Sequence, residues 1–290
     1  MCVRGEALPM SPAPSKVSPQ FRGVLNGATS GLVIKPLLHS YLLDAKFPKH
    51  FTVTFRQHDL DRGPDGWFHP STHPLWTERQ LWYWVHKPET FIAEQREYMG
   101  VLSITMGSAV HDFQETCLKD MGVLLTPEEP CPCGDPECTE WYVEDLELKS
   151  RGHMDGKSAL HVPGYPQLTQ QVYEFKTITE RAKLPPKDND LDWLIAKRPG
   201  YYAQLQEYMR MSGLRLAIIL FMAMGHPWEM REIHVPFNDK FSFDLVQKYR
   251  RVREASPDHL PPTCCGPGSK DSKACMFRGT CPVALETFNG

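Results

Sequence analysis

The sequence predicts an α/β (α+β) protein in which one mixed sheet is flanked by helices. Residues 214–224 are apolar except for Arg215, and a run of this length suits a buried strand. Residues 230–235 alternate between apolar and polar, and an amphipathic helical pattern follows over residues 239–253. A continuous apolar strand and an alternating strand, found beside helical segments, are typical of a sheet covered by helices.

The first hundred residues contain helical and aromatic segments. Residues 30–43 predict a helix interrupted at Pro36, and residues 88–121 are helical in pattern. Within the second segment, Gly107 either permits close helix packing or marks a break. Four tryptophans between residues 57 and 86 either pack in the core or stack on unpaired bases; they are Trp67, Trp76, Trp82 and Trp84.

Two predicted strands, residues 141–162 and 168–178, are joined by the turn sequence Pro163-Gly164-Tyr165-Pro166. We expect a hairpin-like pair that brings Asp155 near Glu174. A helix over residues 201–211, ended by Gly213, places Gln204 and Tyr208 on one face.

The strand around Glu174 carries opposite charges on one surface. Because side chains alternate along a strand, Val172, Glu174 and Lys176 share one face, while Tyr173, Phe175 and Thr177 share the other. A carboxylate beside an ammonium in a cleft provides a ligand for a hard cation and a group that orients water or neutralises a phosphate. The alternative is an ordinary surface ion pair.

Four motifs occur in a specific order along the chain. Gly107 precedes His111 by four residues, Gly152-His153-Met154-Asp155-Gly156 comes next, Glu174-Phe175-Lys176-Thr177 follows, and Gln204 and Tyr208 come last. This order resembles the RecB-type branch of the PD-(D/E)xK nuclease superfamily, over roughly residues 100–285. The resemblance implies a restriction-endonuclease-like core and a Mg2+- or Mn2+-dependent DNA exonuclease, acting on single-stranded DNA or DNA ends.

The resemblance also assigns roles to residues. It implies catalytic functions for Asp155, Glu174, Lys176, Gln204 and Tyr208, with the last two contacting DNA or fixing Lys176. The metal ligands it implies are His111, Asp155, Glu174 and the backbone carbonyl of Phe175. An imidazole among the ligands favours tolerance of Mn2+.

Nine cysteines in a chain expected to be intracellular indicate metal or cluster ligation. Cys264, Cys265, Cys275 and Cys281 resemble the C-terminal cysteine group of RecB-type nucleases that carry a 4Fe-4S cluster, such as AddB-like subunits and the Cas-four-type exonucleases. The chain departs from those families because residues 30–43, where a distant cysteine ligand is expected, contain none.

A second cysteine group lies in a loop rich in Gly and Pro, and comprises Cys131, Cys133 and Cys138. Three interpretations remain open. The group supplies a ligand to a cluster shared with the late cysteines, it binds zinc separately with an unidentified partner, or all the thiols are reduced and bind no metal.

The net charge of -3 requires any DNA-binding surface to be local. Candidate DNA contacts are Lys183, Lys187, Lys197 and Arg198, and a second basic run comprises Lys248, Arg250, Arg251 and Arg253. Either run is otherwise a solvated face.

The chain contains no Walker-type motif, so we expect any unwinding to come from a helicase, recombination or CRISPR-adaptation partner. No apolar run reaches eighteen residues and the N-terminus lacks the apolar core of a signal peptide, which predicts a cytoplasmic protein without membrane association. We expect a flexible tail over residues 1–25, an N-terminal region over 26–100 and a nuclease domain over 101–290.

Two other functions are compatible with the sequence. One is a lambda-exonuclease-like alkaline nuclease, which shares the Asp and Glu-x-Lys core but does not need the late cysteines. The other is a cluster- or zinc-stabilised DNA-binding module with an inactive nuclease site, against which the intact Asp155, Glu174 and Lys176 argue.

Overall fold

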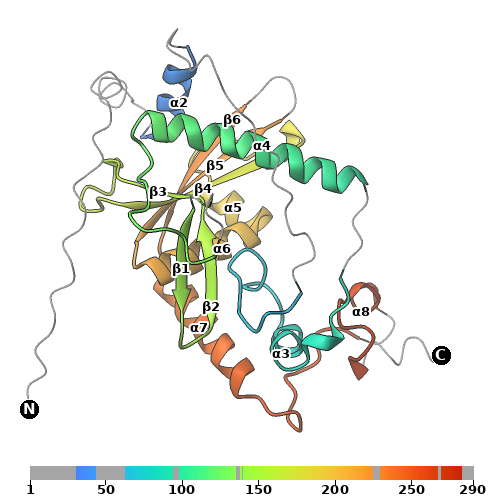
Figure 1. Cartoon of the computed structure of the whole chain (residues 1–290). Coiled ribbons are helices and arrows are strands. Elements are labelled where there is room, and N and C mark those ends of the chain that lie inside the picture. Colours follow the sequence, from blue (N-terminus) through green and yellow to red (C-terminus); the bar gives the residue numbers. More distant parts are fainter. Residues whose placement is uncertain are drawn as a thin grey trace, which may run out of the picture.

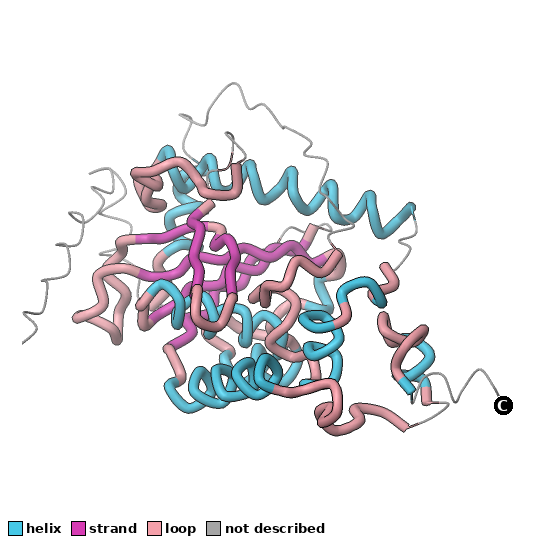
Figure 2. Tube along the Cα trace, turned by 60° about the horizontal axis from the view of Figure 1, so that its bottom comes forward, coloured by secondary structure: helices cyan, strands magenta, loops and turns pink. Residues whose placement is uncertain are grey.

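The computed structural model describes residues 31–43, 63–93, 98–134, 138, 140–224, 229–266 and 269–282. The expected tail over residues 1–25 lies outside them. Strands occupy the centre of the molecule and helices cover them from two sides (Figure 1, Figure 2). The predicted class, a mixed sheet flanked by helices, is confirmed. Across these described ranges, every helix is too short or too polar to cross a membrane.

The main sheet has the strand order β3-β4-β5-β6. Its strands are β3 (Gly156–Ser158), β4 (Gln171–Ile178), β5 (Leu216–Ala223) and β6 (Met230–Pro236). β4 and β5 are parallel, whereas β3 and β6 pair antiparallel to their neighbours. A separate antiparallel hairpin joins β1 (Trp141–Asp145) to β2 (Ser150–Met154). All eight residues of β5 are buried, which explains its uninterrupted apolar sequence.

Each face of the sheet is covered by its own helices. On one face lie α2 (Ile34–Leu43) and α4 (Tyr98–Asp120), and on the other lie α5 (Leu191–Lys197) and α6 (Pro199–Ser212) (Figure 1). The alternation expected for β4 is present: Tyr173 and Phe175 pack in the cluster on the α4 side, and Val172 packs in the cluster on the α6 side. Glu174 and Lys176 therefore belong to the α6 face.

A third hydrophobic cluster lies beside the sheet. It is built from α3 (Glu78–His86), α7 (Asp239–Glu254) and the segment that includes α8 (Lys270–Ala274). Short 3-10 helices are also present: Pro88–Thr90 follows α3, and Arg181–Lys183 follows β4. Trp82 and Trp84 are 2% and 4% exposed, and their indole N–H groups donate to the carbonyls of Ala255 and Trp67. These two tryptophans pack in the core and are not available to stack on bases.

Three predicted elements differ from the observed ones. Residues 141–162 form β1, β2 and β3 instead of one strand, because the chain turns at Lys149, whose φ is 49°, and leaves the hairpin at Asp155. Pro36 does not interrupt a helix: it lies in the first turn of α2, where a missing N–H breaks no intrahelical bond. The helical pattern expected over residues 88–121 is longer than the helix observed there, since α4 covers Tyr98–Asp120.

Gly107 lies inside α4 where the helix crosses the main sheet. A Cβ built on Gly107 would lie 2.9 Å from Thr177 Oγ1 on β4, closer than real Cβ contacts allow. The glycine therefore permits close packing of α4 on β4, one of the two roles expected from the sequence. Gly213 ends α6 with φ 72°, as expected.

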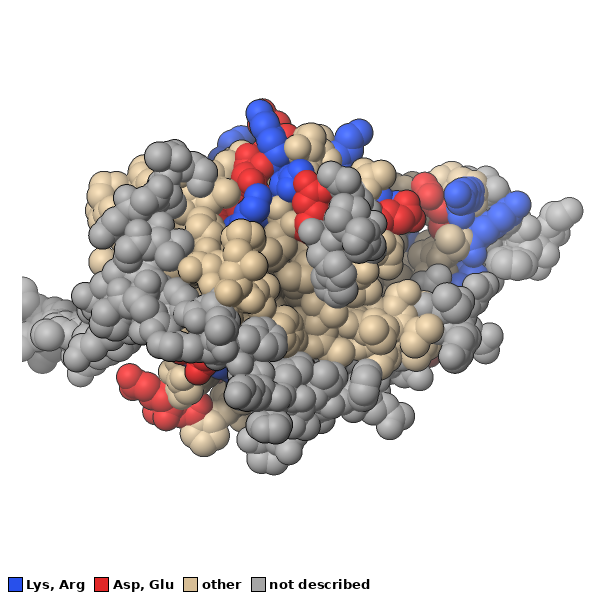
Figure 3. All heavy atoms as spheres, turned by 90° about the horizontal axis from the view of Figure 1, so that it is seen from above, with Lys and Arg blue, Asp and Glu red and all other residues tan. Residues whose placement is uncertain are grey.

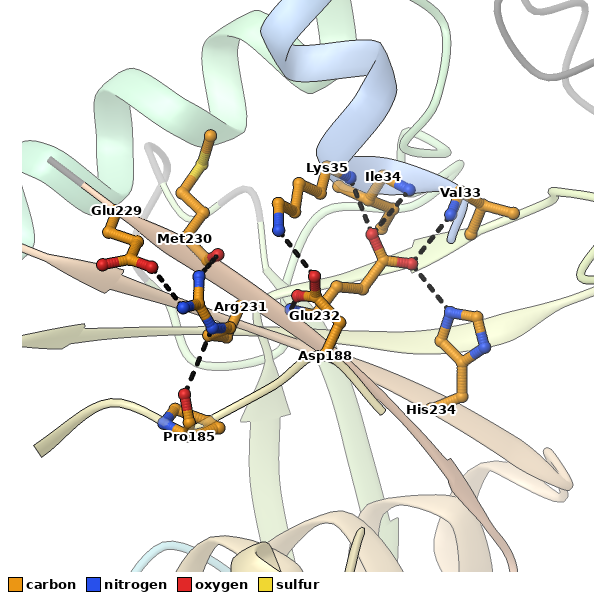
Figure 4. Close-up of polar contacts among 10 residues, drawn as sticks. All are labelled: Val33, Ile34, Lys35, Pro185, Asp188, Glu229, Met230, Arg231, Glu232 and His234. Atoms are coloured by element: carbon orange, nitrogen blue, oxygen red, sulfur yellow. Dashed lines mark hydrogen bonds and ion pairs between the residues drawn. The ribbon is translucent and has the colours of Figure 1, made fainter. Parts of the chain in front are cut away.

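Glu232 on β6 anchors α2 to the sheet, and is completely buried (Figure 4). Its carboxylate accepts hydrogen bonds from the backbone N–H groups of Val33, Ile34 and Lys35 at 2.7–3.0 Å, and Oε1 lies 2.7 Å from His234 Nε2. The N–H groups in the first turn of a helix lack intrahelical partners, so a carboxylate there satisfies them and the helix dipole together.

Replacing Glu232 is expected to destabilise the protein strongly. Glu232→Ala leaves two buried N–H groups and one half-buried N–H group without an acceptor, and we expect a loss of about 2–4 kcal/mol in the free energy of unfolding. Urea-induced unfolding measures it. The matched control is Glu147→Ala, which removes the exposed partner of Arg250 and is expected to cost less than about 1 kcal/mol. Equal losses in the two variants would contradict this role of Glu232.

Candidate active site

Asp155 lies at the point where the chain passes from the β1–β2 hairpin into the main sheet. Its Oδ2 accepts a hydrogen bond from the Phe175 N–H at 2.7 Å and lies 3.0 Å from Nε2 of His111 on α4. Burial favours a raised pKa for Asp155, but His111, Lys176 and the Phe175 N–H outweigh it and the pKa is lowered. Asp155 is therefore held as a carboxylate between a helix and the central strand.

Glu174 is the most buried acidic group of the site, with 1% of its surface exposed. Its Oε1 lies 2.5 Å from Lys176 Nζ and accepts a hydrogen bond from Gln204 Nε2 at 2.8 Å. Burial raises the pKa of Glu174 to about 7, and the negative charge of Asp155 adds to the rise while Lys176 and His111 oppose it. Two carboxylates thus lie close enough to disfavour each other's charge.

Lys176 follows Glu174 on the same face of β4, and its ammonium lies 5.4 Å from the centre of the Tyr201 ring. Burial favours a lowered pKa for Lys176, but the carboxylates of Glu174 and Asp155 outweigh it and raise the pKa. The side chain is therefore a charged hydrogen-bond donor at neutral pH and not a general base.

Gln204 and Tyr208 both lie on α6 and are 5% and 3% exposed. Gln204 donates to Glu174 and, at 3.3 Å, to the Tyr208 hydroxyl, which in turn donates to the backbone carbonyl of His153. The sequence led us to expect contacts with DNA or with Lys176. In the structure they hold Glu174 and the strand that leads to Asp155, because α6 packs directly against this face of the sheet. A contact with DNA stays a prediction.

A cavity of about 460 Å³ opens between α4 and the ends of the central strands. It is lined by both predicted and unexpected polar groups, among them His111, Asp155, Lys176, Asp112 and Glu140. Asp112 and Glu140 were missed by sequence reasoning. The only available signal was adjacency, since Asp112 follows His111 and Glu140 precedes β1. His111, Asp112 and Glu115 also bring their ligand atoms within 4.8 Å of one another.

The cavity residues His111 and Asp155, together with the buried Glu174 beside Lys176, fit a divalent cation. Glu174 Oε2 is buried and has no hydrogen-bond partner within the described residues, although its other oxygen has two. Two carboxylates and an imidazole are ligands suited to Mg2+ or Mn2+. A cation would satisfy Glu174 Oε2 and relieve the repulsion between the carboxylates. The N–H of Phe175 is used by Asp155, which leaves its carbonyl as the expected additional ligand.

The second cysteine group, Cys131, Cys133 and Cys138, converges on a histidine. Cys131, Cys133, Cys138 and His153 bring one sulfur or nitrogen atom each within 4.8 Å of one another, which is the arrangement of a metal-binding group. The partner that the sequence left unidentified is therefore His153 on β2. This arrangement favours the separate site over a cluster shared with the late cysteines.

The late cysteines form their own group at the third hydrophobic cluster. Cys275 and Cys281 are buried against it, and Cys264 and Cys265 are half-buried. The pKa of Cys265 is raised to about 11, mainly by burial, and the neighbouring Cys264, Cys281 and Cys275 raise it further. These cysteines lie in one region of the fold, but no three of their sulfur atoms come within 4.8 Å of one another.

The basic residues fall into two sets with different environments. Lys183, Lys187 and Lys197 are exposed and follow β4, while Arg198 is half-buried at the start of α6. The second run is partly engaged within the protein: Lys248 and Arg253 donate to backbone carbonyls, whereas Arg250 and Arg251 form exposed ion pairs with Glu147 and Glu78. Along one edge of the face in Figure 3, basic and acidic side chains alternate. In the first set Lys183 is also paired, with Glu180, so Lys187 and Lys197 are the exposed lysines of that set without an ion pair in the described residues.

No protein-family model matches the chain, and no curated protein matches its sequence. Among solved structures, SSO0001 is 15% identical with a TM-score of 0.38, covering 87% of this chain and 95% of that one. An alkaline exonuclease from Laribacter hongkongensis is 10% identical with a TM-score of 0.35, covering 65% and 86%. A phage-related exonuclease from Haemophilus somnus 129PT is 13% identical with a TM-score of 0.37, covering 60% and 76%. These similarities are distant, so the residues of the site itself must carry a functional inference.

Binding of a divalent cation is expected to depend steeply on pH. Burial favours a lowered pKa for His111, but Asp155 outweighs it and raises the pKa to about 9, while that of Glu174 is about 7. A cation needs both groups deprotonated. We therefore expect the Mn2+ dissociation constant to rise at least roughly 100-fold from pH 8 to pH 6, with proton release.

Isothermal titration calorimetry in buffers of different ionisation enthalpy measures both quantities. The control is His111→Gln, in which one titrating ligand is absent and the pH dependence becomes shallower. A dissociation constant that is the same at pH 6 and pH 8 would exclude these two residues as ligands.

Proposed function

We propose that this protein is a metal-dependent nuclease of the PD-(D/E)xK type that hydrolyses phosphodiester bonds in DNA. The observation that carries the proposal is the convergence of four groups. His111, Asp155 and Lys176 line one cavity, and Glu174, buried beside Lys176, has one carboxylate oxygen without a hydrogen-bond partner in the described residues. A surface ion pair, the simpler interpretation of Glu174 and Lys176, does not account for a Glu174 that is 1% exposed.

Phosphodiester hydrolysis needs an attacking water, relief of the charge that develops on the phosphate, and stabilisation of the leaving oxygen. Mg2+ or Mn2+ bound by His111, Asp155, Glu174 and the Phe175 carbonyl would supply the Lewis acid and the acidified water. Lys176, charged and lining the cavity, donates a hydrogen bond to the water or to a phosphate oxygen. Gln204 keeps Glu174 in place.

The substrate proposed is single-stranded DNA or a DNA end, cut as an exonuclease. The exposed Lys183 and Lys187 lie in the connection that follows β4, Lys197 ends α5, and their charges suit the phosphates of a strand leading into the cavity. A helicase, recombination or CRISPR-adaptation protein is the kind of partner that would supply such ends.

The catalytic assignment is tested by two substitutions and a control. Asp155→Ala and Lys176→Ala are each expected to lower Mn2+-dependent cutting of end-labelled single-stranded DNA by at least roughly 100-fold, while binding to the same DNA is retained. The control is Lys240→Ala, which removes an exposed lysine from α7, 83% exposed and paired with Asp244, and leaves cutting unchanged.

The same assay separates the alternatives. Linear single strands that are degraded while closed circles survive support an exonuclease, whereas cut circles indicate an endonuclease. Wild-type protein that binds DNA but cuts nothing with any divalent metal would replace the nuclease proposal with a DNA-binding module.

We also propose that Cys264, Cys265, Cys275 and Cys281 bind a 4Fe-4S cluster, which needs four thiolates. The burial of Cys275 and Cys281 against the third hydrophobic cluster supports this, because an iron-sulfur cluster there would fasten the C-terminal segment to α3 and α7. Anaerobic purification is expected to give a brown protein with about four irons per chain. Cys275→Ser should lose the colour and iron, whereas Cys117→Ser, which alters a buried thiol on α4, should keep both. A colourless wild-type protein without iron would overturn the cluster.

A further inference from the structure

Four soft metal ligands converge at the edge of the β1–β2 hairpin. The donor atoms of Cys131, Cys133, Cys138 and His153 lie within 4.8 Å of one another. Cys131 Sγ is 3.1 Å from His153 Nε2, and the backbone N–H of Cys133 donates to the same sulfur at 3.4 Å. Zinc–ligand bonds of roughly 2.0–2.3 Å can be completed to all four atoms of such a group by small side-chain shifts. We propose that these four residues bind one zinc ion with a structural role.

The donor set identifies both the metal and its role. Three thiolates and one imidazole form a Cys3His set, which is a standard tetrahedral coordination of structural zinc. Sulfur ligands discriminate against Mg2+ and Mn2+, the ions suited to the carboxylates of the neighbouring cavity. Because all four positions are filled by the protein, no position is open for a substrate or an attacking water. The site therefore serves structure and not chemistry.

The ion would fasten a long connection to the sheet. The chain between α4 and β1 contains no helix or strand in its described residues, apart from an isolated bridge between Leu124 and Ser158. Connections of this length without regular structure need another constraint to be ordered. Three of the four ligands come from this connection and the fourth comes from β2, so one ion ties the loop to the hairpin.

The proposed zinc site is continuous with the candidate active site, an inference that rests on the proposed function. His153 is two residues before Asp155, and its backbone carbonyl accepts the Tyr208 hydrogen bond. Glu140, which lines the cavity, follows Cys138 by two residues. The ion would thus fix His153 through its ring while Tyr208 fixes it through its backbone. Loss of zinc is expected to weaken Mn2+ binding at Asp155 by roughly 10–100-fold, the usual effect of removing support for metal ligands.

Metal analysis of the full-length protein tests the site. Purified under reducing conditions, the wild type is expected to contain about one zinc ion per chain, by plasma mass spectrometry. Cys133→Ser removes an exposed thiol and is expected to lose that zinc. Cys275→Ser, which alters the late group, and Asp155→Ala, which alters the cavity, should both retain it.

Cobalt gives a second readout that needs no variant. Metal-free wild-type protein titrated with Co2+ is expected to show the visible absorption of tetrahedral cobalt together with thiolate charge-transfer bands, and added Zn2+ should abolish both. Wild-type protein without zinc in which Cys131, Cys133 and Cys138 titrate as free thiols or form disulfides would overturn the proposal. So would a Cys133→Ser protein, folded by circular dichroism, that still contains the zinc.

These measurements distinguish failure of the zinc site from failure of the proposed function. Zinc content and cobalt spectra do not depend on DNA cutting. A zinc-containing wild type that cuts no DNA would leave the zinc site in place and remove the nuclease. A zinc-free wild type that cuts DNA would do the reverse.

Discussion

Burying a carboxylate on a strand costs free energy because the charge loses its hydration, so specific partners must hold it there. Glu174 is such a group. Lys176 compensates its charge, Gln204 donates to the same oxygen, and the second oxygen has no hydrogen-bond partner in the described structure. The surroundings are therefore arranged to keep Glu174 buried while leaving it incompletely satisfied. That residual demand for a partner is what makes the cavity suitable for a cation, and it explains why α6 presents polar side chains to an otherwise apolar face of the sheet.

The other proposed metal ligands reach Glu174 through independent parts of the fold. Asp155 comes from the passage between the hairpin and the main sheet, and His111 comes from α4, which approaches β4 closely because Gly107 has no side chain. Each is fixed by a bond to another element: Asp155 by the Phe175 N–H and His111 by Asp155. Rigid elements placed in this way hold ligands more accurately than loops do. The site therefore depends on the packing of α4 on the sheet as much as on the ligands themselves.

Strong periodicity made part of this structure predictable. β5, β6, α6 and α7 were expected close to their observed bounds, because a buried strand and an amphipathic helix each leave a clear sequence pattern. The division of residues 141–162 was not, since the positive φ of Lys149 and the change of sheet at Asp155 depend on tertiary pairing. For the same reason the sequence indicated Cys131, Cys133 and Cys138 but not His153. The motif around Glu174 indicated which residues matter, whereas the partner of Gln204 could be seen only once α6 was placed against β4.

The third hydrophobic cluster joins segments that lie far apart in the sequence. Trp82 on α3 donates to the carbonyl of Ala255, Arg79 donates to that of Pro261, and Phe277 stacks on Tyr83. These contacts span more than 170 residues, so α3 gains its partners only after the C-terminal segment has been synthesised. During translation the tryptophan-rich segment therefore keeps its apolar surface exposed to water. The strands of the main sheet, which are synthesised before the C-terminal segment, can already pair. The cluster is thus the last part of the molecule to close, and the order of synthesis makes α3 the segment most in need of protection from aggregation.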